Sequence, residues 1–291
     1  MVSKSQQLMA QHPLQRLSSP SRGISVIIHL LGIISFTLSY KYLVDFPTLI
    51  NDSYGWHWQY LTILGLTVAY ATFIFGFLAD LTLSPKLFLI KNSLALCSAP
   101  LEVLISVLYW GICAIDKTLV VPPEIYIDPY ADVGFHAMPA ILLTIDLLFL
   151  SPPWTIHAVP AMGLSSAIAV GYWAWVEHCF KHNGFYPYPL FAQLDTIQRT
   201  ALFTTAALTM TASTMTLRWL HGRLEEAKVA AELQRIADDK LFKEQERAFA
   251  RDDHELKWKR LEEKEELERE YQARRRDHVE LNREDDNIKA K

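Results

Sequence analysis

Long apolar stretches recur along the first three quarters of this chain and are separated by short polar segments. Six of them are long enough to cross a bilayer as α-helices, which need about 20 predominantly apolar residues. They lie at residues 24–42, 61–79, 87–115, 134–150, 157–180 and 196–220. Helices satisfy their own backbone in lipid, and these stretches lack the alternation of barrel strands. The pattern predicts an all-α, polytopic membrane protein with six transmembrane helices.

The last part of the chain follows a different pattern. Residues 221–291 carry 18 basic and 21 acidic side chains, against 10 and 11 in residues 1–220. Dense mixed charge without proline favours a long charged helix stabilised by pairs four residues apart. Phe242, Phe249 and Leu256 are spaced by seven. Self-association as a coiled coil, a single solvated helix and a cytosolic partner that binds residues 225–291 therefore all stay open.

The distribution of charge in the short loops predicts the topology. The chain divides into an N-terminal segment at 1–22, a membrane domain at 23–220 and the charged tail at 221–291. Basic residues of short loops favour the cytosol. If the N-terminus lies in the cytosol, the basic residues on the cytosolic side are Lys4, Arg16, Arg22, Lys86, Lys91, Arg218 and Arg223. We therefore expect both termini, and the helical tail, in the cytosol.

Composition excludes several classes of protein and site. The net charge of −4 is small and the basic residues of the tail alternate with acids, so we expect no nucleic-acid partner. Three scattered cysteines form neither a disulfide framework nor a CxxC site. His178 and His182 are four apart and fit metal ligands, with Glu177 or His57 joining them, but histidines are too few for a di-metal oxidase. We expect no metal and no organic cofactor.

Two residues at the starts of different spans are candidates for catalysis. Thr62 begins the second predicted span and His136 begins the fourth, and both spans enter from the lumenal side. The two side chains therefore lie at similar shallow depth. A neutral imidazole can take the proton of a hydroxyl as its oxygen attacks a carbonyl, so the pair fits a nucleophile and a general base. Asp132 and Asp116 are the candidates for orienting the imidazole.

Each of these residues also has a simpler interpretation. A threonine in a membrane helix usually bonds the carbonyl four residues earlier, and Thr67 and Thr72 compete with Thr62. His136 also fits an interfacial histidine bonded to a backbone carbonyl. The aromatic residues near the same surface fit an interfacial belt or, in a second interpretation, the lining of a substrate groove: Trp58, Tyr60 and Trp175.

Several segments resemble one known family. They are Trp58-Gln59-Tyr60-Leu61-Thr62, Tyr109-Trp110 followed by Asp116-Lys117 and Pro122, Gly134-Phe135-His136 followed by Asp146, Gly171-Tyr172 followed by Trp175-Val176, and Tyr188-Pro189. In this order and spacing, over about residues 24–220, they resemble the androgen-induced protein family, which includes androgen-dependent TFPI-regulating protein. The tail has no counterpart in that family.

The resemblance implies an activity. Members of the family are intramembrane threonine hydrolases that cleave fatty acid esters of hydroxy fatty acids, and their nucleophile and catalytic histidine map on Thr62 and His136. It also implies a lipid substrate in the bilayer and a location in the endoplasmic reticulum or another endomembrane. A non-catalytic membrane anchor or scaffold that recruits partners through its tail is the competing hypothesis. A transporter is disfavoured, because the ionisable groups gather at one surface instead of the midplane.

Overall fold

The computed structural model describes residues 22–151 and 156–289, and the regular structure within those ranges is entirely helical. The elements are α2 (Arg22–Asp45), η1 (Leu49–Asp52), η2 (Trp56–Gln59), α3 (Leu61–Thr82), α4 (Pro85–Asp116), η3 (Lys117–Leu119), α5 (Pro129–His136), α6 (Met138–Ile145), η4 (Asp146–Leu150), α7 (Ala158–Asn183), α8 (Pro189–Gln193) and α9 (Thr196–Lys289). The predicted all-α class is confirmed. The predicted N-terminal segment, except Arg22, lies outside the described residues.

Four helices in the described ranges are long and apolar enough to cross a membrane: Gly23–Asp45, Leu61–Thr82, Pro85–Leu119 and Ala158–Asn183. A fifth results if Pro129–His136 and Met138–Leu150 count as one bent span. These coincide with the first five predicted spans, which confirms a polytopic membrane protein. The sixth predicted span, residues 196–220, forms the start of α9 and does not reach the same apolarity, because eight threonines lower its mean hydropathy.

The fourth predicted span differs from the single helix expected at 134–150. The helix begins earlier, at Pro129, breaks at Ala137 and bends by 42° before Met138. Pro139 explains the break, because proline has no N–H to donate to the carbonyl of Phe135 and its ring crowds the preceding turn. His136 therefore lies at the end of a short helix and not at the start of a long one.

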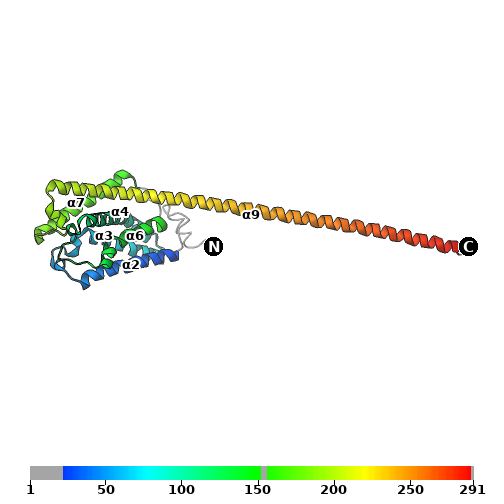
Figure 1. Cartoon of the computed structure of the whole chain (residues 1–291), viewed down its shortest axis with the longest axis horizontal. Coiled ribbons are helices and arrows are strands. Elements are labelled where there is room, and N and C mark those ends of the chain that lie inside the picture. Colours follow the sequence, from blue (N-terminus) through cyan, green and yellow to red (C-terminus); the bar gives the residue numbers. More distant parts are fainter. Residues whose placement is uncertain (1–21, 152–155, 290–291) are drawn as a thin grey trace. The chain divides into compact units, whose positions relative to one another are not determined.

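The helix α3 packs most extensively against α4 and α2 in the first compact unit, which ends at Glu225. The axes of the long helices of this unit are similarly inclined (Figure 1). Glycines allow α2 and α3 to approach closely. A Cβ on Gly32 would lie 2.1 Å from Phe73 Cδ1, and one on Gly76 would lie 2.4 Å from His29 Nε2. Small residues serve this purpose at helix contacts in membranes.

A buried ionic network joins α2, α3, α4 and η4. Lys91 Nζ lies 2.6 Å from Asp146 Oδ2 and donates to Ser151 Oγ at 2.6 Å. His29 lies between two carboxylates, with Nδ1 2.7 Å from Asp80 Oδ2 and Nε2 3.1 Å from Asp146 Oδ1. Lys91 and Asp146 are 1% and 0% exposed. Asp146, the acid of the family resemblance, thus belongs to this network and not to the surroundings of His136.

The second compact unit, Glu226–Lys291, continues α9 to Lys289. Its side chains are exposed wherever the structure describes them. Pairs four residues apart join its charges: Asp239–Lys243, Glu255–Lys259 and Arg269–Glu265, at 2.7, 2.9 and 3.4 Å. Exposed pairs of this kind each contribute about 0.3–0.5 kcal/mol to a helix.

The buried network predicts a large effect of removing one partner. Lys91→Met leaves the Asp146 carboxylate without its cation, so we expect a loss of about 3–5 kcal/mol in the free energy of unfolding. Adding Asp146→Leu should recover part of it. Thermal unfolding in detergent micelles measures both. The matched control is Lys41→Met, whose exposed pair with Asp45 should contribute less than about 1 kcal/mol. Equal melting temperatures for Lys91→Met and Lys41→Met would contradict the assignment.

Candidate active site

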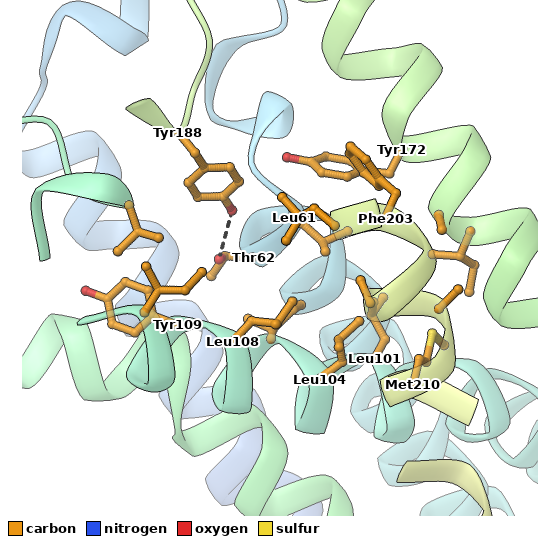
Figure 2. A pocket seen from close by; sticks show the side chains of 18 of the residues that line it. Leu61, Thr62, Leu101, Leu104, Leu108, Tyr109, Tyr172, Tyr188, Phe203 and Met210 are labelled. Atoms are coloured by element: carbon orange, nitrogen blue, oxygen red, sulfur yellow. Dashed lines mark hydrogen bonds between the residues drawn. The ribbon is translucent and has the colours of Figure 1, made fainter. Parts of the chain in front are cut away.

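Thr62 is the second residue of α3 and is buried. Thr67 and Thr72, further along the helix, each donate to the carbonyl four residues earlier at 2.7 Å. Thr62 lies too close to the start of α3 for such a bond, because the carbonyl four residues earlier, that of Trp58, belongs to η2 and accepts from Trp175 Nε1. Its Oγ1 instead faces the hydroxyl of Tyr188 at 3.4 Å (Figure 2), a long and weak hydrogen bond. The Thr62 hydroxyl is therefore available for chemistry.

His136 is the last residue of α5 and is held by Asp132 one turn earlier. Its Nδ1 lies 2.8 Å from Asp132 Oδ1 and 3.1 Å from the Asp132 carbonyl. Both partners are acceptors, so Nδ1 carries the proton and Nε2 keeps its lone pair. The imidazole stacks on the ring of Tyr109 from α4, with centroids 3.4 Å apart and planes inclined by 6°. Lys117 Nζ lies 3.5 Å from the other carboxylate oxygen of Asp132.

Two cavities meet at Thr62. Cavity A has an empty volume of about 840 Å³ and lies among α3, α4, α7 and α9; Figure 2 shows the side chains around it. Cavity B, of about 710 Å³, lies among α2, η2, α5 and the segment 120–127. Residues that line both are Thr62, Tyr109, Val120 and Tyr188.

The two predicted catalytic residues come together in cavity B. Thr62 and His136 both line it, although they come from helices more than seventy residues apart in the chain. In the described part of the chain no hydrogen bond joins them, since Thr62 Oγ1 faces Tyr188 and His136 Nδ1 faces Asp132. Catalytic hydrogen bonds often tighten only when substrate binds.

The start of α3 is electropositive around Thr62. The N-cap residue of this 22-residue helix, Tyr60, makes no side-chain bond to it, and the first backbone N–H groups have no partner within the helix. Burial raises the pKa of the Tyr188 hydroxyl, and bonds from the Thr62 hydroxyl and from the backbone amides of Thr62 and Leu61 oppose this shift. A neutral phenol and two amides therefore gather beside the Thr62 hydroxyl.

The other predicted site residues lie in different places. Asp116 is exposed, and its Oδ1 accepts from the backbone N–H and the hydroxyl of Thr118 at 2.9 and 2.7 Å. Tyr60 lines cavity B, where it packs edge-on against Tyr188 at 5.3 Å between centroids. Trp175 Nε1 donates to the Trp58 carbonyl at 3.0 Å, and neither of these side chains lines either cavity.

The histidines that the sequence offered as metal ligands contact other side chains of the protein. His178 Nε2 lies 3.1 Å from the Tyr54 hydroxyl, and the His182 ring stacks on Tyr54 at 4.1 Å. His57 Nε2 donates to Asn51 Oδ1 at 3.1 Å. Within residues 22–151 and 156–289, no group of three or more His, Cys, Asp or Glu side chains has an arrangement that could hold a metal ion.

Sequence reasoning missed two aromatic residues that contact the candidate pair. Tyr109 covers one face of His136, and Tyr188 approaches the Thr62 hydroxyl. Both stood in segments that carried the family resemblance, Tyr109-Trp110 and Tyr188-Pro189, but nothing in their spacing indicated these contacts. They reach the site from α4 and from the segment before α8, so only the packing reveals them.

Fold and site together define an all-helical integral membrane protein with a buried polar junction between two cavities. A sequence model of the FAR-17a/AIG1-like protein family matches residues 24–222, and the chain belongs to this family. The resemblance seen in the sequence is thereby confirmed. The chain is 34% identical over 206 residues to a UPF0641 membrane protein of Schizosaccharomyces pombe, which covers 70% of this chain and 92% of the relative. No solved structure matches the chain.

The environment of His57 in cavity B predicts a pH dependence of stability. Burial lowers the pKa of His57 from 6.5 to about 4. Between these two values the unfolded chain binds a proton that the folded protein does not, so stability is full above pH 6.5 and falls as the pH drops towards 4. We expect His57→Phe to lose less thermal stability than wild type between neutral pH and pH 5. Parallel unfolding curves measured over this range for the two proteins would refute the assignment.

Proposed function

We propose that this protein is an intramembrane ester hydrolase that uses Thr62 as nucleophile and His136 as general base. The observation that carries the proposal is the convergence of the two residues on cavity B, with Asp132 holding His136 in the tautomer that leaves Nε2 free to accept a proton. A nucleophile, a base and a group that orients the base are the parts that covalent catalysis of acyl transfer requires. Fatty acid esters of hydroxy fatty acids are the substrates that the family resemblance implies.

The reaction proceeds in two steps. His136 Nε2 takes the Thr62 proton as Oγ1 attacks the ester carbonyl carbon; the bond to the alcohol oxygen then breaks, and the proton passes to that oxygen. Water next attacks the acyl carbon and gives a proton to His136; the bond from that carbon to Thr62 Oγ1 then breaks, the proton passes from His136 to Oγ1, and the fatty acid leaves. Asp132 stabilises the imidazolium in both steps, because its carboxylate lies 2.8 Å from Nδ1.

The negative oxygen of the tetrahedral intermediate needs donors close to Thr62. The start of α3 carries the backbone N–H groups of Leu61 and Thr62, which bond the Tyr188 hydroxyl, and this hydroxyl lies 3.4 Å from Thr62 Oγ1. Helix N-termini favour negative charge, and donors that are fixed before the reaction lower its barrier most. We assign these groups to the oxyanion.

In the proposed topology the chain crosses the membrane six times, with both termini in the cytosol and the site on the lumenal side of the endoplasmic reticulum. The sixth span is residues 196–220 at the start of α9. Hydrogen bonding supports it, because its hydroxyls donate to carbonyls four residues earlier and so need no water: Thr200, Thr204, Thr209, Thr211, Ser213 and Thr214.

The second candidate function is a non-catalytic membrane scaffold. Its supporting observation is the exposure of apolar side chains beyond Glu225: Phe242, Phe249 and Leu256 are 65%, 77% and 55% exposed. Their seven-residue spacing fits self-association as a coiled coil or a cytosolic partner for residues 225–291. Loss of function on deletion of residues 226–291, with Thr62→Ala silent, would favour this alternative over hydrolysis.

Substitution of the nucleophile or of the base tests the hydrolase directly. Thr62→Ala and His136→Ala should each lower ester hydrolysis by about 100- to 10,000-fold, because either change removes proton transfer to or from the reacting oxygen. A fluorophosphonate probe should label wild type and not Thr62→Ala. Thr67→Ala is the matched control on the same helix, since Thr67 only bonds Ile63 and Tyr40. Undiminished hydrolysis by Thr62→Ala would end the proposal.

The two aspartates that the sequence offered as orienting groups form a second test. Asp132→Asn turns the acceptor of the Nδ1 proton into an amide, so we expect kcat to fall by more than about tenfold. Asp116→Asn should leave kcat unchanged, because the exposed Asp116 only caps η3. Stopped assays on purified protein at neutral pH compare the two. The reverse order of effects would exclude Asp132 as the orienting group.

A further inference from the structure

The two cavities that meet at Thr62 indicate where each half of an ester substrate binds. Resting on the proposed function, we infer that the fatty acyl chain of the ester occupies cavity A and that the alcohol half occupies cavity B. The ester group then lies between Thr62, Tyr109 and Tyr188, which line both cavities.

The position of His136 determines the orientation of the ester between the two cavities. His136 must give its proton to the oxygen of the departing alcohol, and this oxygen has to lie within hydrogen-bond reach of Nε2. His136 lines cavity B and not cavity A. The alcohol half therefore extends into cavity B, and the acyl group that stays bonded to Thr62 extends the other way.

Cavity A fits an acyl chain in shape and chemistry. Its walls are mainly aliphatic and aromatic side chains of α3, α4, α7, α8 and α9, and none of the lining residues is exposed. Two of the polar groups among them bond within the protein: the Tyr172 hydroxyl donates to the Gln59 carbonyl and the Ser165 hydroxyl to the Ala161 carbonyl. Leu101 lines the cavity eight residues before Tyr109 on α4, about 12 Å along the helix, so the cavity is deep enough for a chain.

Cavity B fits the bulkier alcohol half, which is released after the first step. It carries His57, His136 and Thr48 besides apolar side chains, and two of its lining residues are exposed, Phe46 at 61% and Tyr126 at 78%. Cavity B thus has exposed residues in its lining, and cavity A has none. The free alcohol departs through it, and the water for the second step enters beside His136 in the space that the alcohol vacates.

The experiment fills each cavity separately in the full-length protein. Ala206→Phe from α9 and Ala169→Phe from α7 each narrow cavity A, and Ile125→Trp narrows cavity B. One ester series lengthens the acyl chain on a fixed secondary alcohol, and another enlarges the alcohol on a fixed acyl chain. Ala201→Phe is the matched control, because Ala201 is exposed on α9 and lines neither cavity.

In wild type, kcat/KM should rise up to about fourfold for each methylene that enters cavity A and then level off. Ala206→Phe and Ala169→Phe should move this plateau to shorter acyl chains and leave the alcohol preference unchanged. Ile125→Trp should lower kcat/KM at least about tenfold for the largest alcohols and leave the acyl plateau in place. Fluorophosphonate labelling of each variant at the wild-type rate verifies that Thr62 remains intact.

The outcomes separate this inference from the proposed function. If the variants that narrow cavity A changed the alcohol preference, and the variant that narrows cavity B changed the acyl preference, the assignment would be reversed. If no variant changed either preference, the assignment would be wrong. In both cases the proposed hydrolase would still stand. If wild type and Thr62→Ala hydrolyse every ester equally, the hydrolase itself fails, and the inference fails with it.

Discussion

A bilayer provides no water for a buried polar group, so each one must find its partner inside the protein. The ionic network of α2, α3, α4 and η4 meets this requirement, since Lys91 and Asp146 pair with each other and His29 with two carboxylates. These pairs, together with the close approach at Gly32 and Gly76, hold α2, α3 and α4 in one arrangement. The geometry around Thr62 depends on this framework, because α3 and α4 carry both Thr62 and Tyr109.

The candidate active site is one place in the described part of the chain where the same requirement is only partly met. Thr62 Oγ1 has one long contact, to Tyr188, and His136 bonds Asp132 through Nδ1 alone. Both residues lie at helix ends, Thr62 in the first turn of α3 and His136 in the last turn of α5. Helix ends leave backbone donors and acceptors unpaired, and those are the groups that chemistry can use. The break before Pro139 is what gives His136 such an end.

The apolar pattern predicted the class and the boundaries of the long helices closely. Five of the six predicted spans match helices or a bent pair of helices that can cross a membrane. The expectation of matched depth paired Thr62 with His136, and both line cavity B, although His136 ends α5 and does not begin a long helix. Depth could not decide between Asp132 and Asp116. Asp132 shares a helix face with His136 four residues later, whereas Asp116 caps η3.

By itself the sequence determined that this is a helical membrane protein and where most of its long helices lie, because hydrophobic length and the cost of charge in lipid act on local stretches of chain. The sequence also indicated the family, because short segments that resemble it occur in a fixed order. Only the tertiary structure decided what surrounds Thr62, because Tyr109 and Tyr188 reach the site from distant elements. Only packing opened two cavities there, since the space between helices depends on side chains that meet across the fold and not along the chain.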